Sequence, residues 1–207
     1  MFRILLFSVP FLTTVAFADF CPSNDEIQRG GTAYIARANT IPSNTTLGET
    51  GWLSPSGQPM LSSGNPKSTA TALFGLSATQ TLTKGTDRGA MSQALLENFL
   101  VKAPAEVFGG GLTVTTESHC NCDEPTILAR TELSDLTIQG IQQRVTGATN
   151  QVIYLPNGFG RVVVNEQIAM KGPYDSRIEV NGLHIQLVTG QDIVLGHAEA
   201  EVHCRMP

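Results

Sequence analysis

The chain has 207 residues, of which only 15% are charged, and a formal net charge of −5. This length suits one domain with a substantial core, whereas two domains would be cramped. Lysine and arginine are too few to form a basic stripe that neutralises phosphates, so nucleic acid is not an expected partner.

The first residues have the layout of a secretory signal peptide. Arg3 supplies a positive charge, an apolar run follows, and Ala16-Phe17-Ala18 provides small residues at the cleavage-recognition positions. We predict that residues 1–18 are removed and that residues 19–207 form a single β domain, secreted to the exterior or the periplasm. The apolar run, about 12 residues, and every later one are too short for a helix to cross a bilayer, so no integral membrane span is expected after cleavage.

In the N-terminal third of the mature chain, the sequence predicts strands on either side of a long irregular segment. Residues 32–41 and 69–83 alternate between apolar and polar side chains, as strands do. Residues 42–68 between them are rich in Pro, Gly, Ser and Asn, and we expect them to form the contact region for a partner. This segment contains Trp52, the only tryptophan. We predict that Trp52 plugs one end of the core; the alternative is a platform for a ligand.

The remaining elements are expected to be strands, with one ambiguity. Residues 89–102 fit a short helix, because Met91, Leu95 and Phe99 recur every four positions, but the same run also alternates as a strand. From Leu112 onward, short alternating segments are separated by Gly, Pro and Asn turns; the last two segments, residues 177–188 and 192–204, are joined at Thr189-Gly190-Gln191. The pattern predicts an all-β fold, an antiparallel β-sandwich or flattened barrel, with one short helix near residues 89–102 as a variant.

The four cysteines predict two disulfides in an oxidising compartment. A bond between Cys120 and Cys122 would be strained, so we expect one of them to pair with Cys204 and the other with Cys21. The alternative is a zinc or copper site in which these thiols are joined by two histidines, His119 and His203. Disulfides are preferred, and no cofactor is expected.

Three titratable residues are the candidates for catalysis. Glu166 lies in a β-branched strand, and His184 and His197 lie in the last two predicted strands, where a hairpin could bring them to one face near Glu166. Such a cluster could perform acid–base work or bind a metal. The competing interpretation is structural: Glu166 faces solvent or an arginine, and the histidines donate to neighbouring polar groups.

The second half of the chain resembles a known family. The resemblance rests on Val162-Val163-Val164-Asn165-Glu166-Gln167, Val180-Asn181-Gly182-Leu183-His184 and a last strand that ends at Cys204, together with an earlier Thr50-Gly51-Trp52-Leu53 segment. In this order they are similar to the choice-of-anchor P family of bacterial secreted proteins. The resemblance implies a secreted or surface-displayed protein with no transferable activity, and it favours a strand at residues 89–102. It adds Asn165, Gln167 and Asn181 to Trp52 as candidate binding residues.

Three functions fit this sequence. The first is a non-catalytic extracellular binding domain or an envelope-associated structural domain, whose partner is an unidentified extracellular protein or polysaccharide. The second is an extracellular hydrolase or metal-dependent enzyme, which requires Glu166, His184 and His197 to converge on one concave site. The third is a subunit of an extracellular polymer joined through strand edges. We prefer the non-catalytic interpretation.

Overall fold

The computed structural model describes residues 27–40, 43–54, 60–65, 69–70, 72–102, 104–122 and 124–204. The predicted signal peptide and Cys21 lie outside these ranges. Within them, no helix combines the length and apolar character that crossing a bilayer requires. The one helical element described is a single 3₁₀ turn, Pro156–Gly158.

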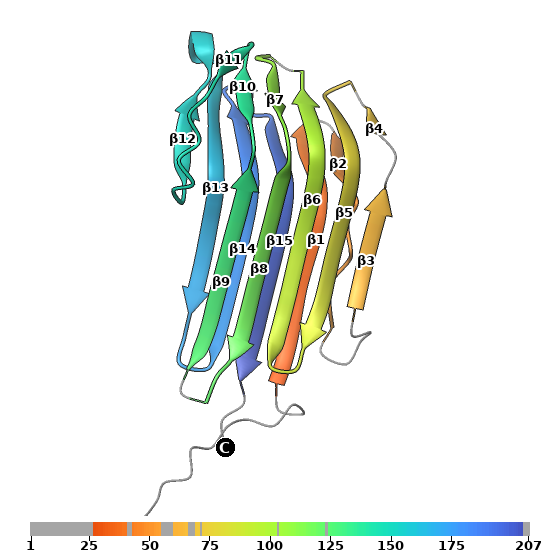
Figure 1. The fold of residues 1–207 in the computed structure, drawn as a ribbon, viewed down its shortest axis with the longest axis vertical. Helices are drawn as coiled ribbons and strands as arrows, with labels where there is room; N and C mark the ends of the chain where they lie inside the picture. Colours follow the sequence, from red (N-terminus) through yellow and green to blue (C-terminus); the bar gives the residue numbers. More distant parts are fainter. Residues whose placement is uncertain are drawn as a thin grey trace, which may run out of the picture.

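Two antiparallel sheets pack face to face as a sandwich (Figure 1), which confirms the predicted fold class in its sandwich form. The six-stranded sheet has the order β12 (Gln151–Tyr154), β13 (Gly160–Lys171), β14 (Asp175–Leu187), β15 (Asp192–Cys204), β1 (Ile27–Thr40) and β2 (Ser43–Leu47). The nine-stranded sheet runs β11 (Ile141–Gln142), β10 (Leu136–Ile138), β7 (Val107–Gly109), β6 (Gly89–Val101), β5 (Phe74–Thr86) and β3 (Met60–Asn65). Beside this path, β4 (Thr69–Ala70) pairs with β5, and β8 (Leu112–Cys120) lies between β6 and β9 (Pro125–Leu133).

The helix considered for residues 89–102 is wrong, because these residues form the central strand β6. Ala90, Ser92 and Ala94 alternate into the interior, and the strand pairs with β5 on one side and β8 and β7 on the other. The pairing skips Glu97, so the alternation changes phase there and Phe99 also faces inward.

The inward–outward alternation of side chains also changes phase in the six-stranded sheet, as it does at Glu97 of β6. The pairing registers of β1, β13, β14 and β15 skip Ile35, Asn165, Gly182 and Gly196, one residue on each strand. Asn165 and Gly196 have positive φ angles of 53° and 64°. Leu112 of the facing sheet packs against this row, since a Cβ atom on Gly182 would lie 2.8 Å from its Cδ1. Gly182 is therefore needed for space, and Gly196 both for its backbone conformation and for space.

The phase change separates two kinds of interior. Toward the C-terminal ends of β14 and β6, which form the upper half of the molecule as drawn in Figure 1, the interior contains large apolar side chains such as Leu183, Ile185 and Phe99. In the lower half many inward residues are small or carry hydroxyls, alongside the buried apolar residues Ile27, Ile178, Val180 and Val202; the small and hydroxyl-bearing ones include Ala33, Thr81, Thr83, Ala90, Ser92, Thr116, Ser118, Ser176, Ala198 and Ala200. Hydrogen bonds such as those of Ser92 with Thr83 and Ser118 with Ser176 satisfy several of these buried hydroxyls.

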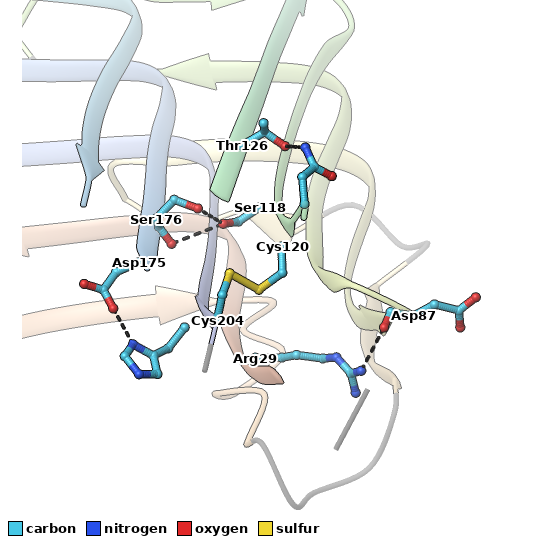
Figure 2. Close-up of a disulfide and its surroundings, with 10 residues drawn as sticks. Arg29, Asp87, Ser118, Cys120, Thr126, Asp175, Ser176 and Cys204 are labelled. Atoms are coloured by element: carbon cyan, nitrogen blue, oxygen red, sulfur yellow. Dashed lines mark hydrogen bonds and ion pairs between the residues drawn. A yellow bond between two sulfur atoms is a disulfide. The ribbon is translucent and has the colours of Figure 1, made fainter. Parts of the chain in front are cut away.

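A disulfide joins the sheets at the lower end. Cys120 of β8 bonds to Cys204 of β15, and the hydroxyls of Ser118 and Ser176 lie beside it, 2.6 Å apart (Figure 2). This bond confirms the predicted pairing of Cys204 with one member of the Cys120/Cys122 pair. Cys122 is also disulfide-bonded, and the predicted role of Cys21 lies outside the described residues.

Candidate functional site

His184 is held between two carboxylates on the outer face of the six-stranded sheet. Its Nδ1 lies 2.7 Å from Glu166 Oε2, and its Nε2 lies 2.5 Å from Asp192 Oδ1. Burial alone would lower the pKa of His184, but the hydrogen bonds to Glu166 and Asp192 outweigh it and raise that pKa. The hydrogen bond from His184 in turn lowers the pKa of Glu166. The geometry therefore favours an imidazolium that donates to two carboxylates.

Asn181 connects this cluster to His197 on the next strand. The Asn181 amide donates to Glu166 Oε2 at 2.7 Å, and its Oδ1 accepts from His197 Nδ1 at 2.7 Å. Burial lowers the pKa of His197 to about 3, so this ring is neutral. The ring of Tyr34 stacks on it with centroids 4.2 Å apart, and Arg37 lies over Tyr34 at 4.1 Å. The result is a continuous polar network across β13, β14, β15 and β1.

The three predicted catalytic residues thus lie on one face, as the hydrolase hypothesis requires. Glu166 and His184 are in direct contact, and His197 joins them through Asn181. Both ring nitrogens of His184 are already engaged, however, and the cavities described below are not lined by these residues. A general base needs a free lone pair beside its substrate. The network is better suited to holding four strands together than to acid–base catalysis.

The predicted binding residues Asn165 and Gln167 also make internal contacts. Asn165 donates to the carbonyl of Gly147 at 3.3 Å and accepts from the Gln167 amide at 2.9 Å. The Gln167 backbone N–H donates to Asn150 Oδ1 at 2.8 Å. These bonds hold the loop before β12 against β13. Together with Asn181 in the network above, three of the four predicted binding residues stabilise the sheet.

The metal site considered for His119 and His203 is wrong. Cys120 and Cys204 are bonded to each other, and the two histidines point to opposite outer faces of the sandwich. His119 Nε2 is 2.9 Å from Glu117, and His203 pairs with Asp175. Among the described residues, no group of three or more His, Cys, Asp or Glu side chains could hold a metal ion.

A groove of about 560 Å³ lies at the lower end of the same outer face. The register places Met170, Arg177, Glu201 and Gly30 side by side on β13, β14, β15 and β1. Trp52, which follows β2, lies over Gly30, where a Cβ atom would be 2.7 Å from its ring. Trp52 is 49% exposed and Met170 is 62% exposed, so they form the walls, while Arg177 and Glu201 provide a charged floor.

The prediction that Trp52 plugs the core is therefore wrong. The neighbouring Leu53 takes that role: it is 2% exposed, and its N–H donates to the carbonyl of Gly31 at 2.8 Å. Consecutive residues in an extended segment point to opposite sides. Burial of Leu53 consequently leaves Trp52 on the outside, where the alternative of a ligand platform becomes geometrically feasible.

The two charged residues of the groove floor, Arg177 and Glu201, differ in the ion pairs that they form. Arg177 Nε is 2.6 Å from Glu199 Oε1, and its Nη2 is 3.4 Å from Glu179. Burial raises the pKa of Glu199, although the Arg177 charge opposes that effect. Glu201, beside Trp52, takes no part in the hydrogen bonds and ion pairs found among the described residues. Its carboxylate is free to accept from a ligand.

Sequence reasoning missed Arg177 as a site residue. Counting outward from a turn at Thr189-Gly190-Gln191 would pair Glu201 with Glu179, whereas the observed register pairs Glu201 with Arg177. The position of Trp52 over Gly30 depends on the path of a loop and has no periodic signal in the sequence either.

Comparison with known proteins adds no relative. No protein-family model and no curated protein matches the chain. Among solved structures, Neisserial surface protein A aligns with 10% identity and a TM-score of 0.18, covering 87% of this chain and 97% of that chain. A score this low carries no inference about fold or function, so the function must be argued from the groove itself.

Proposed function

We propose that the protein is a non-catalytic, exported β-sandwich domain that binds a polysaccharide in the groove beside Trp52. The observation that carries this proposal is the half-exposed indole of Trp52, which lies over Gly30 next to the unengaged carboxylate of Glu201. Export is supported by the predicted signal peptide and by the resemblance to the choice-of-anchor P family, both of which are sequence predictions.

The chemistry of the groove fits a sugar better than other small ligands. An indole offers an apolar surface for the C–H face of a pyranose ring and remains available at low cost in side-chain entropy. Beside it, Glu201 accepts hydrogen bonds, Arg177 donates them, and Gln28 can do both, which matches the hydroxyls of a sugar. The groove volume lies within the range of roughly 300–1,000 Å³ that is usual for ligand sites.

The only tryptophan of the chain makes the proposal directly testable. We would titrate the mature protein with hexasaccharides of β-1,4-linked glucose, of β-1,4-linked N-acetylglucosamine and of α-1,4-linked glucose while recording tryptophan emission. Binding of at least one of them is expected to shift or quench the emission, because the indole changes from a wet to a covered environment. Unchanged emission with all three would contradict the proposal.

Two variants and a control define the residues involved. Trp52→Ala and Glu201→Ala should each weaken binding at least about tenfold, roughly 1.4 kcal/mol, measured by calorimetry with the best hexasaccharide. Tyr154→Ala removes an aromatic ring that is 79% exposed on β12, away from the groove residues, and should leave the affinity unchanged. Equal affinity of Trp52→Ala and the parent protein would refute the assignment of the site.

The hypothesis of an extracellular polymer stays a prediction from the sequence. Concentration-dependent light scattering of the purified mature protein tests it, since a polymer subunit would grow in mass with concentration and a separate binding domain would not.

A further inference from the structure

Strand β9 has a long edge without a neighbour among the described residues. All nine of its residues are in register with β8 on one side, from Pro125 opposite Cys120 to Leu133 opposite Leu112, and no described strand pairs with its other side. The outermost strands β2, β3, β11 and β12 have only five, six, two and four residues. Exposed edges are normally kept short because their free N–H and C=O groups pair with other chains.

The facing sheet extends beyond this edge. In Figure 1, β13 projects past β9 on the left of the molecule. The upper part of β13 buries Val162 and Val164 between the sheets, but Ala169, which faces the same side lower down, is exposed. Its inward direction follows from its register with the buried Ile178 of β14. Within the described part of the chain, no strand therefore covers the inner face of lower β13.

The uncovered space has two defined ends. Near the end of β9, a cavity of about 560 Å³ is lined by residues of both sheets, including Thr131, Leu133, Val145 and Asn165. The Thr131 hydroxyl is shielded from solvent there and has no hydrogen-bond partner among the described residues. At the other end, Lys171 and Glu124 join the sheets by an ion pair of 3.0 Å. From Asn165 to Lys171 an extended chain spans about 20 Å.

We propose that this edge of β9 binds an extended peptide segment of a partner protein, which adds a strand to the nine-stranded sheet. Successive N–H and C=O groups along a strand edge are matched by another polypeptide backbone, whereas a sugar has no such repeat. Alternate side chains of the peptide would lie over Ala169, so small or apolar residues fit there. On the outer face they would meet Leu128, which is 62% exposed.

A second copy of the chain fits this edge less well than a peptide. β9 packs against β14 and β13 of the facing sheet, and β13 already reaches past the edge. Two copies joined through β9 would each bring an overhanging β13 into the space held by β14 of the other. A single added strand avoids this overlap, and the ligand is therefore a flexible or terminal segment.

The test uses a display library of random ten-residue peptides, panned on the mature protein. Enriched peptides are expected to alternate in polarity, and a fluorescein-labelled copy should bind in an anisotropy assay. Ala169→Arg places a long charged side chain in the proposed site and should weaken binding at least tenfold. Ile168→Arg is the matched control: it is the adjacent residue, 51% exposed on the opposite face of β13, and should leave the affinity unchanged.

Hydrogen exchange supplies an independent readout on the parent protein. Amides of β9 that point to the free edge are expected to become protected when the peptide binds. Failure to enrich any peptide, equal affinity of Ala169→Arg and Ile168→Arg, or no new protection in β9 would each overturn the proposal. A concentration-dependent dimer that Ala169→Arg disrupts would identify a second copy as the occupant, and would also overturn it.

This proposal stands apart from polysaccharide binding in the groove. Trp52→Ala should leave peptide binding unchanged, and Ala169→Arg should leave the response to hexasaccharides unchanged. Loss of one activity therefore does not imply loss of the other.

Discussion

His184 and His197 lie on neighbouring strands of one polar network, but the sheet stabilises them in opposite protonation states. His184 donates to Glu166 and Asp192, which raises its pKa. His197 is buried under Tyr34, faces the positive charges of Arg37 and Arg177, and has a pKa lowered to about 3. The arrangement requires a neutral ring at the centre and a charged ring at the border of the network.

The two histidines should affect stability in different pH ranges. A raised pKa stabilises the fold fully below the unfolded-state value of about 6.5, and this contribution is lost as the pH rises through the folded-state value. A lowered pKa stabilises the fold above about 6.5, and this contribution is lost as the pH falls toward the folded-state value. Between pH 6.5 and 5, the contribution of His184 is therefore constant and that of His197 declines.

We expect the contribution of His197 to the free energy of unfolding to fall by about 2 kcal/mol as the pH is lowered from 6.5 to 5. The raised pKa of Glu199 acts in the opposite sense, so the comparison needs a variant that removes only the imidazole. His197→Gln should be less stable at pH 7.5, since it loses the stacking with Tyr34, but its stability should fall less steeply below pH 6.5. Urea unfolding followed by circular dichroism at several pH values measures both slopes. Parallel slopes would contradict the assigned neutral state.

At the scale of strands, the phase change across the six-stranded sheet decides which side chains reach the outer face. Without it, Glu166 would follow Val162 and Val164 into the interior by simple alternation. Because each of four strands shifts by one residue at the same level, Glu166, Asn181 and His197 point outward together. The polar network therefore depends on a feature of the backbone.

Glycine at this row should be needed for packing as well as for conformation. Gly196 has a φ of 64°, and a Cβ atom there would lie 3.0 Å from Leu112 Cδ2. Gly140 has a similar φ of 73° with nothing within 4 Å, so it is a matched control. Gly140→Ala should cost about 1 kcal/mol of unfolding free energy, and Gly196→Ala about 2–3 kcal/mol, because overpacking adds to the backbone strain. Equal losses in urea unfolding would mean that Leu112 does not constrain the row.

Turn residues made the bounds of several strands predictable, whereas a strand with large apolar side chains on both faces was ambiguous. The strands before and after the predicted turn at Gly190 were expected within a few residues of their observed bounds, although both cross the phase change. Residues 89–102 were ambiguous because Leu95, Leu96, Phe99 and Leu100 place apolar side chains on both faces of the strand, a pattern that also fits a helix. For the site, hairpin geometry allowed Glu166 and His184 to meet, but solvent or an arginine was the preferred surrounding of Glu166, and Trp52 was assigned to the core. A loop residue carries no periodic signal that tells one face from the other.

At the scale of the whole molecule, the lower half of the interior mixes large apolar side chains with many small or hydroxyl-bearing ones. Beside Ile178 and Val180, numerous Ala, Ser and Thr residues are buried, and each of these removes less apolar surface from water than a large side chain does. Hydrogen bonds such as that between Ser118 and Ser176 contribute only about 1 kcal/mol each. A covalent link between the sheets at this end adds to these contacts, and it is packed against the buried side chains of Ile27 and Val202.

The Cys120–Cys204 disulfide should therefore contribute strongly to stability. Its half-cystines are 84 residues apart, and closing a loop of that length in the unfolded chain stabilises the fold by roughly 4–5 kcal/mol in the chain-entropy model. We expect the double variant Cys120→Ala/Cys204→Ala to lose about this amount in urea unfolding. Ser118→Ala, which removes a buried hydroxyl beside the disulfide, serves as the local control and should cost about 1–2 kcal/mol. A loss in the double variant no larger than in this control would show that hydroxyl and apolar contacts hold the lower half together without the covalent link.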